Sequence, residues 1–287
     1  MAQILIVHGI SNQYSGENEL REPWYLALCD GLIRAGRRQA APPIDSCYCP
    51  FYGDLFRPGN PLGSDFVDEE ELAEADENVA NLLNAIWTAT SASDPAVPSP
   101  ESFKETLFRA PRIAERALNS LAKSKYLADY APLRFFGDLK QVALYMNDGE
   151  IHEKVLGRIM GKIQAGTKIV IGHSLGSVVA YEAICKKPEN VTAFVTVGSP
   201  LGLRNVVFDK LTPSPDGFGL GRWPGSVKHW TNIAAKGDIV AAQKELAPLF
   251  GNQVEDFQID SGWDAHSSTG YLNSLEAGRA LSRALDL

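Results

Sequence analysis

The predicted fold rests on one stretch, Lys168–Gly176, which reads KIVIGHSLG. Residues 169–171 form an uninterrupted β-branched run, which is typical of a strand covered on both faces, as in a parallel sheet. Apolar residues then recur at helical spacing over 178–184, and two lysines follow them. The pattern therefore predicts a buried strand, a tight turn at Ser174 and a helix over residues 175–187.

Gly172, Ser174 and Gly176 form a Gly-x-Ser-x-Gly motif at this turn. A nucleophilic serine on a sharp turn needs small residues two positions before and after it, because the turn crowds the backbone. The start of the following helix also points backbone N–H groups at the place where charge would develop on a substrate oxygen. A chance match in a loop is the alternative, but the flanking strand and helix favour a nucleophile elbow with Ser174 as the nucleophile.

A second motif follows the first predicted strand, residues 3–8, which ends in His8-Gly9-Ile10. The glycine allows the backbone to come close to a substrate, and the next N–H can then point into the site as an oxyanion donor. The alternative is an ordinary strand-to-loop glycine. Beside Ser174, the interpretation as an oxyanion loop is preferred.

Further elements complete an α/β pattern. Strands are expected at residues 46–51, 191–197, 227–233 and 253–259, and helices at 20–37, 148–165, 175–187 and 271–285. The first strand, helix and second strand have the spacing of a βαβ unit, whose two strands are parallel. We therefore expect an α/β fold with a mostly parallel central sheet of about six strands flanked by helices.

The regular alternation stops between residues 54 and 145. Amphipathic helices are expected at 66–90 and 101–125, whereas 126–146 has no clear pattern. We predict a single domain, residues 1–287, with a core of about 1–53 and 146–287 and a helical insertion of about 54–145. The insertion is interpreted as a cap or lid that forms an acyl-binding cleft, and the alternative is a packing subdomain whose apolar stripe is only core.

A nucleophilic serine needs a base, and the positions of the five histidines indicate which one it is. Four of them fall in other places: His8 after the first strand, His152 on a helix, His173 inside the serine motif and His229 in a strand. His266 alone lies in a loop after a late strand, where an imidazole can reach the edge of the sheet. We therefore predict His266 as the general base.

The acid that orients the base should follow a strand and precede His266. The candidates are Asp238, Glu245, Glu255, Asp256, Asp260 and Asp264. Asp238 directly follows the strand that ends near residue 233, at the edge of the sheet where catalytic groups gather in open α/β folds. Asp238 is therefore the preferred acid, with Asp264 as the main alternative.

These residues together resemble the α/β-hydrolase superfamily. The resemblance is carried by Gly172-His173-Ser174-Leu175-Gly176, by Val7-His8-Gly9-Ile10, by Asp238 after a strand and by His266 near the end. Within the superfamily the chain is most similar to lipase/esterase-like serine hydrolases. The resemblance covers the sheet regions, and the insertion has no counterpart in it.

The resemblance implies hydrolysis of a small-molecule or lipid ester through an acyl-serine intermediate. Ser174 would attack the ester carbonyl, His266 would take its proton, and the N–H groups of Ile10 and Leu175 would hold the oxyanion. No metal or organic cofactor is implied. Three alternatives use the same residues, namely acyl transfer to another acceptor, thioester cleavage and amide cleavage. A non-catalytic binding module of the same fold is a further alternative.

Composition excludes some classes of function. The net charge is −8 and no basic stripe stands out, so we expect no nucleic-acid partner. No Cys-x-x-Cys pair indicates a zinc site. The N-terminal apolar run is too short for a signal peptide or a transmembrane segment, so a cytoplasmic protein is expected. A transient contact with a membrane surface stays open.

Overall fold

The computed structural model describes residues 4–57, 69–103, 109–127, 131–187, 190–262 and 264–285. Over these residues, six parallel strands form one sheet in the order β2-β1-β3-β4-β5-β6. The strands are β1 (Ile4–Val7), β2 (Cys47–Tyr48), β3 (Ile169–His173), β4 (Ala193–Val197), β5 (His229–Ala235) and β6 (Val254–Ile259). This arrangement confirms the predicted α/β class and the parallel sheet of about six strands.

The strand order reverses between β1 and β3. The chain leaves β1 toward β2 on one side, whereas β3 lies on the other side of β1. In open α/β sheets, the loops that follow two such strands diverge and leave a crevice that binds ligands. Gly9 follows β1 and Ser174 follows β3, so the fold places both predicted motifs at this position.

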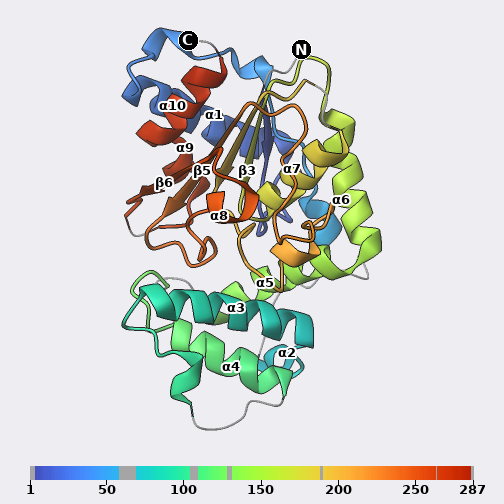
Figure 1. Cartoon of the computed structure of the whole chain (residues 1–287), viewed down its shortest axis with the longest axis vertical. Coiled ribbons are helices and arrows are strands. Elements are labelled where there is room, and N and C mark those ends of the chain that lie inside the picture. Colours follow the sequence, from blue (N-terminus) through green and yellow to red (C-terminus); the bar gives the residue numbers. More distant parts are fainter. Residues whose placement is uncertain are drawn as a thin grey trace.

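Helices cover both faces of the sheet (Figure 1). On one face lie α1 (Glu17–Arg34), α9 (Ser268–Leu272) and α10 (Leu275–Ala284), and on the other lie α6 (Gly149–Lys162) and α7 (Leu175–Lys186). Successive residues of β1 alternate between the two layers, as strand geometry requires. Ile4 and Ile6 belong to the core under α1, and Leu5 and Val7 to the core under α7.

The segment between β2 and α6 is helical in its described parts. It contains α2 (Glu69–Ala73), α3 (Glu77–Ser93), α4 (Ala110–Leu121) and α5 (Pro132–Asn147). Figure 1 shows α2, α3 and α4 as a group beyond one end of the sheet, with α5 between this group and the sheet. Apolar residues of α3 and α5 belong to the same core cluster as the α7 face, so much of the predicted stripe is core packing.

Several predicted helices are divided or displaced. Residues 66–90 were expected as one helix, but α2 and α3 are separate because the Asp76 carboxylate accepts the Val79 N–H and caps a new helix. Residues 66–68 lie outside the described part, as do 104–108 of the helix expected at 101–125. Ser274 divides the closing helix in the same way by capping α10. Two helices were not predicted, α5 and the short α8 (Ala247–Phe250).

A buried carboxylate joins the insertion to the layer beside the sheet. Glu182 on α7 is fully buried, and its Oε2 accepts the Tyr145 hydroxyl of α5 at 2.5 Å. The same oxygen lies 2.8 Å from Nε2 of His152 on α6, while Oε1 accepts the Thr212 N–H at 2.7 Å. The hydrogen bond to Glu182 raises the pKa of His152 above 6.5 even though burial opposes this, and Glu153 and Lys186 also lie near the ring.

We expect this contact to make stability depend on pH. A histidine whose pKa is higher in the folded chain stabilises fully below its unfolded pKa, and this contribution is lost as pH rises through the folded value. His152→Gln keeps a donor for Glu182 but does not titrate, so the loss of stability between about pH 6 and pH 8 should be smaller in the variant. Urea unfolding of both proteins at the two pH values measures this. Identical pH dependence would contradict it.

Candidate active site

Ser174 lies on a strained turn between β3 and α7. Its backbone has φ 54° and ψ −132°, a conformation rare for a residue with a side chain. Such a conformation costs about 1–3 kcal/mol and persists only where neighbours enforce it. Here the Ser174 N–H donates to Val197 O at 3.1 Å, and the Ser177 hydroxyl donates to the Ser174 carbonyl at 2.6 Å.

The turn leaves no space for a Cβ at the two glycines that flank it. A Cβ at Gly172 would lie 2.5 Å from Ser177 Cα, and one at Gly176 would lie 2.2 Å from Val7 O, both against backbone. The crowding that the motif predicts is therefore present. A Cβ at Gly9 would lie 2.7 Å from Ser174 Cβ, so the loop after β1 directly contacts the serine.

Side chains fix the orientation of this loop. The Gly9 carbonyl accepts His8 Nδ1–H at 2.7 Å and Asn12 Nδ2–H at 3.1 Å. Because C=O and N–H point in opposite directions across a trans peptide bond, the Ile10 N–H points away from both donors. Among the described residues, no hydrogen bond uses the N–H of Ile10 or of Leu175. Both groups are therefore available to an oxygen atom of a ligand.

His8 has a supporting position. Its ring is fully buried and stacks on Tyr52 with ring centroids 4.0 Å apart. The Tyr52 N–H donates to His8 Nε2 at 3.2 Å, so Nδ1 carries the ring proton. Burial lowers the pKa of His8 to about 4, and the ring is neutral at pH 7. A neutral ring between two backbone groups suits a residue that holds the loop.

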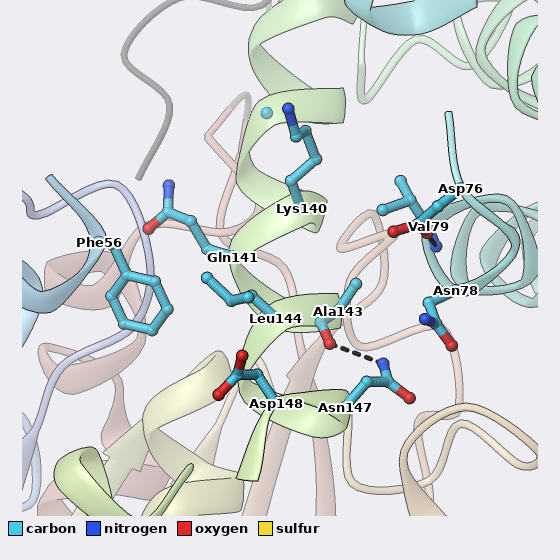
Figure 2. A pocket seen from close by; sticks show the side chains of 11 residues that line it. Phe56, Asp76, Asn78, Val79, Lys140, Gln141, Ala143, Leu144, Asn147 and Asp148 are labelled. Atoms are coloured by element: carbon cyan, nitrogen blue, oxygen red, sulfur yellow. Dashed lines mark hydrogen bonds between the residues drawn. The ribbon is translucent and has the colours of Figure 1, made fainter. Parts of the chain in front are cut away.

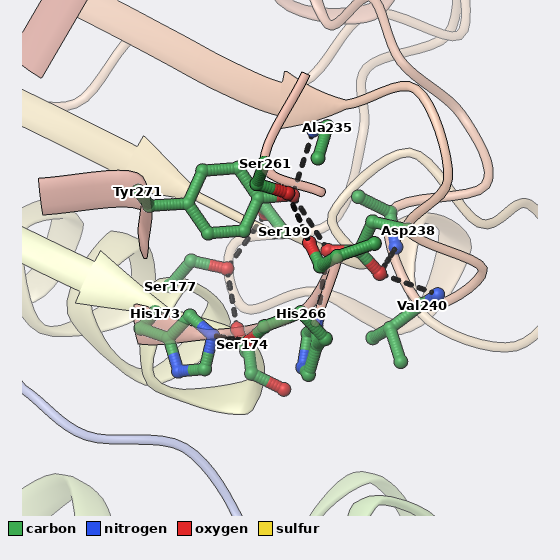
Figure 3. Close-up of polar contacts among 12 residues, drawn as sticks. His173, Ser174, Ser177, Ser199, Ala235, Asp238, Val240, Ser261, His266 and Tyr271 are labelled. Atoms are coloured by element: carbon green, nitrogen blue, oxygen red, sulfur yellow. Dashed lines mark hydrogen bonds and ion pairs between the residues drawn. The ribbon is translucent and has the colours of Figure 1, made fainter. Parts of the chain in front are cut away.

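His266 and Asp238 are in contact, although 28 residues separate them (Figure 3). His266 Nδ1 lies 2.7 Å from Asp238 Oδ2. The carboxylate also accepts the Tyr271 hydroxyl at 2.6 Å and the Val240 N–H at 2.9 Å. Asp264 lines the same cavity without a hydrogen bond to the imidazole among the described contacts, so Asp238 is the carboxylate that holds the ring.

In this pair, burial and the opposite charge of the partner shift each pKa in opposite directions. Burial alone would raise the pKa of the Asp238 carboxyl, but the His266 imidazole and the hydrogen bonds hold it well below its ordinary range. Burial alone would lower the pKa of His266, but the Asp238 carboxylate outweighs it and raises that pKa above 6.5. The pair therefore favours the charged form of both groups.

His173 contacts the loop that carries His266. Its Nε2–H donates to the His266 carbonyl at 2.9 Å, and the two ring centroids are 4.7 Å apart. Burial lowers the pKa of His173 to about 3, so the ring is neutral at pH 7. The neutral His173 ring therefore holds the loop that carries His266 in place.

Two reactive atoms of the site have no partner. Ser174 Oγ and His266 Nε2 are both buried, and neither makes a hydrogen bond within the described part of the chain. They do not bond each other, but both residues line the same cavity. Catalytic hydrogen bonds are often long in unliganded sites and shorten when substrate binds.

The cavity has a volume of about 620 Å³ and two kinds of wall. The loops after β1, β3, β5 and β6 form one side. The insertion forms the other with Tyr126, Leu127, Arg134, Phe135 and Asp138. The Ser11 hydroxyl donates to the Asp138 carboxylate, which links the insertion to the loop after β1. A volume of this size suits a small organic ligand.

Three polar residues of the site were not predicted from the sequence: Asn12, Asp138 and Tyr271. Asn12 and Asp138 hold the loop after β1, and Tyr271 contacts Asp238. Tyr271 is fully buried, and its hydroxyl also accepts the Ala235 N–H at 2.7 Å. Each acts through a contact that no local motif encodes.

We expect Tyr271→Phe to lower kcat about tenfold with KM unchanged, because a hydrogen bond to a charged group contributes roughly 1.5–3 kcal/mol. Tyr271 supports Asp238 and does not line the cavity. The matched control is Tyr181→Phe, which removes one hydroxyl of an equally buried tyrosine that donates to Arg222 O. The ester hydrolysis expected from the sequence provides the assay, so steady-state kinetics on an activated ester measure the effect. An equal loss in both variants would contradict a role for Tyr271.

A second cavity, of about 250 Å³, lies between α3 and α5 (Figure 2). Its two carboxylates are engaged in helix caps, Asp76 at α3 and Asp148 at α6. Asn147 Nδ2 donates to Ala143 O, and Lys140 pairs with Glu71. These four polar groups are therefore engaged within the fold, and the described residues that line this cavity include no serine and histidine pair like that of the first cavity.

No group of three or more His, Cys, Asp or Glu side chains that could hold a metal is found in the described ranges. Within the same ranges, each helix is too short or too polar to cross a membrane. No protein-family model matches the sequence, and a search of curated proteins gave no match.

Proposed function

We propose that this chain is a serine hydrolase of the α/β-hydrolase fold that cleaves carboxylic esters through an acyl-serine intermediate. One observation carries the proposal. The unpartnered hydroxyl of Ser174, on a strained turn, shares a cavity with the unpartnered Nε2 of His266, whose other nitrogen contacts the buried Asp238. This is the arrangement of nucleophile, base and orienting acid that ester cleavage by serine requires.

The first half-reaction forms the acyl-enzyme. His266 Nε2 takes the Ser174 proton while Oγ attacks the ester carbonyl carbon, and the carbonyl π electrons move to oxygen. The N–H groups of Ile10 and Leu175 hold this oxyanion. When the carbonyl reforms, the bond to the alkoxide breaks, and the leaving oxygen takes the proton from His266. The products of this step are an alcohol and an ester on Ser174.

The second half-reaction uses one water molecule. His266 takes a proton from water as the water oxygen attacks the acyl carbon, and the same two N–H groups hold the second oxyanion. Collapse breaks the bond to Ser174 Oγ, which recovers its proton from His266. The net reaction consumes one ester and one water and gives one acid and one alcohol.

Asp238 and the insertion have separate parts in this proposal. Asp238 keeps Nδ1 protonated, so that Nε2 is the nitrogen that faces the cavity, and stabilises the imidazolium during each transfer. Leu127 and Phe135 supply apolar wall on the opposite side of the cavity, where an acyl chain can pack. The helical insertion thus acts as a cap that shapes the acyl cleft.

The direct test is covalent labelling. Incubation with a fluorophosphonate probe should add one probe per chain, and peptide mass spectrometry should locate it on Ser174. The same protein should release p-nitrophenol from p-nitrophenyl butyrate. Folded protein that neither takes up the probe nor releases p-nitrophenol would overturn the proposal and leave a non-catalytic scaffold.

A further inference from the structure

A smaller cavity, of about 270 Å³, adjoins the candidate active site. Tyr126, Gly237, Asp238 and Ile239 line both cavities. A Cβ at Gly237 would lie 2.1 Å from the Tyr126 ring, so the ring packs directly against this glycine. Tyr126, which comes from the insertion, therefore forms part of the wall between the two spaces.

Three lysines line the smaller cavity: Lys125, Lys236 and Lys244. Lys244 Nζ donates to the Asp238 carbonyl, and the Lys125 ammonium lies 4.8 Å from the centroid of the Tyr126 ring. Neither Lys125 nor Lys236 has a carboxylate partner within the described ranges. Three lysines and two aspartates thus line this cavity, in a chain whose net charge is −8.

The two carboxylates that line this cavity are already engaged. Asp94 accepts the Ser124 hydroxyl at 2.7 Å and the Ala96 N–H at 3.0 Å. Asp238 contacts His266 and Tyr271. The Asp238 carboxylate acts on Lys244, but neither carboxylate forms an ion pair with Lys125 or Lys236 among the described residues. An anion from outside can therefore bind beside these two ammonium groups.

A buried hydroxyl in the same cavity also lacks a partner. Thr90 on α3 is 4% exposed, and its Oγ1 makes no hydrogen bond among the described residues. Buried polar atoms are almost always paired, so an unpaired one indicates a missing partner. A hydroxyl donor beside ammonium groups matches the oxygen atoms of a phosphate or a carboxylate.

We propose that the smaller cavity binds an anionic group of the substrate, a phosphate or a carboxylate, while the ester lies at Ser174 on the other side of Tyr126. The substrate class is then an ester that carries an anionic group close to the scissile bond. This inference rests on the proposed function, and it adds the lysine cavity as a subsite.

Binding of inorganic phosphate tests the subsite without any hydrolysis. The test variant is the double change Lys125→Gln and Lys236→Gln, which spares Lys244 because that side chain contacts the backbone of Asp238. Lys123→Gln is the matched control, since Lys123 is exposed and does not line the cavity. Phosphorus NMR titration should show about three- to tenfold weaker binding in the double variant and no change in the control. Equal binding in all three proteins would overturn the subsite.

A pair of activated esters tests the substrate class. Mono-p-nitrophenyl glutarate and p-nitrophenyl valerate have acyl chains of similar length, and only the first ends in a carboxylate. The double variant should lower kcat/KM for the glutarate ester about three- to tenfold and leave the valerate ester unchanged. An unchanged ratio of the two values would overturn the substrate class while the proposed function stands. Wild-type protein that hydrolyses neither ester and takes up no fluorophosphonate probe would overturn the proposed function itself, and phosphate binding would still decide whether the subsite exists.

Discussion

Ser174→Ala is expected to lower kcat for p-nitrophenyl butyrate by about 10³–10⁶-fold, because the variant has no atom that can form the acyl intermediate. The remaining rate would come from the oxyanion donors and from binding alone. KM should change little, since the Ser174 side chain is small and the cavity wall stays intact. Initial rates over a range of substrate concentrations measure both values.

The same change should leave the fold intact. The Ser174 hydroxyl makes no hydrogen bond in the described chain, so its removal should alter the free energy of unfolding by less than about 1 kcal/mol. Ser268→Ala is the matched control, because Ser268 lines the same cavity without a place in the mechanism. Equal activity of wild type and Ser174→Ala would contradict the assignment of the nucleophile.

Asp238→Asn is expected to lower kcat by about 10³–10⁴-fold, a loss comparable with that in serine proteases whose orienting aspartate is replaced. An amide at this position can present an N–H to Nδ1, which leaves the proton on Nε2 and removes the base. Asp264→Asn is the matched control, because Asp264 lines the cavity without a hydrogen bond to the imidazole among the described contacts.

The pH profile separates this role from a purely structural one. In the wild type the His266 pKa lies above 6.5, because the Asp238 carboxylate outweighs burial. Neutral His266 is the active form, so kcat/KM should fall as pH drops through this pKa. Without the carboxylate, burial prevails and the pKa of His266 falls. The acid limb of the Asp238→Asn profile should therefore move to lower pH, and an unmoved limb would contradict the contact.

Local patterns were enough to predict the parts of the site that follow strands. The β-branched run before Gly172 and the glycines around Ser174 describe the turn by themselves, because its geometry depends on residues that are neighbours in sequence. The sheet followed from the same kind of pattern. His266 was predicted because it is the one histidine in a loop after a late strand, and Asp238 was predicted because it follows a strand. The fold places these two side chains in contact.

The parts that could not be predicted depend on distant residues. Tyr271 reaches Asp238 because α9 packs on the face of the sheet that α1 and α10 also cover. Asp138 reaches Ser11 across 127 residues, from a helix whose sequence gave no clear pattern. α2 and α3 are separate helices because Asp76 caps α3. The apolar stripe continues across this position, so the sequence pattern predicted a single helix.

The opposed walls of the large cavity come from separate lengths of polypeptide. The turn at Ser174 admits no larger residue at Gly172 or Gly176, so mutant libraries at those positions would yield mostly inactive clones. The wall built by Leu127 and Phe135 carries no such steric restriction from the turn. Directed evolution of new selectivity should therefore sample the insertion and keep the strand ends fixed.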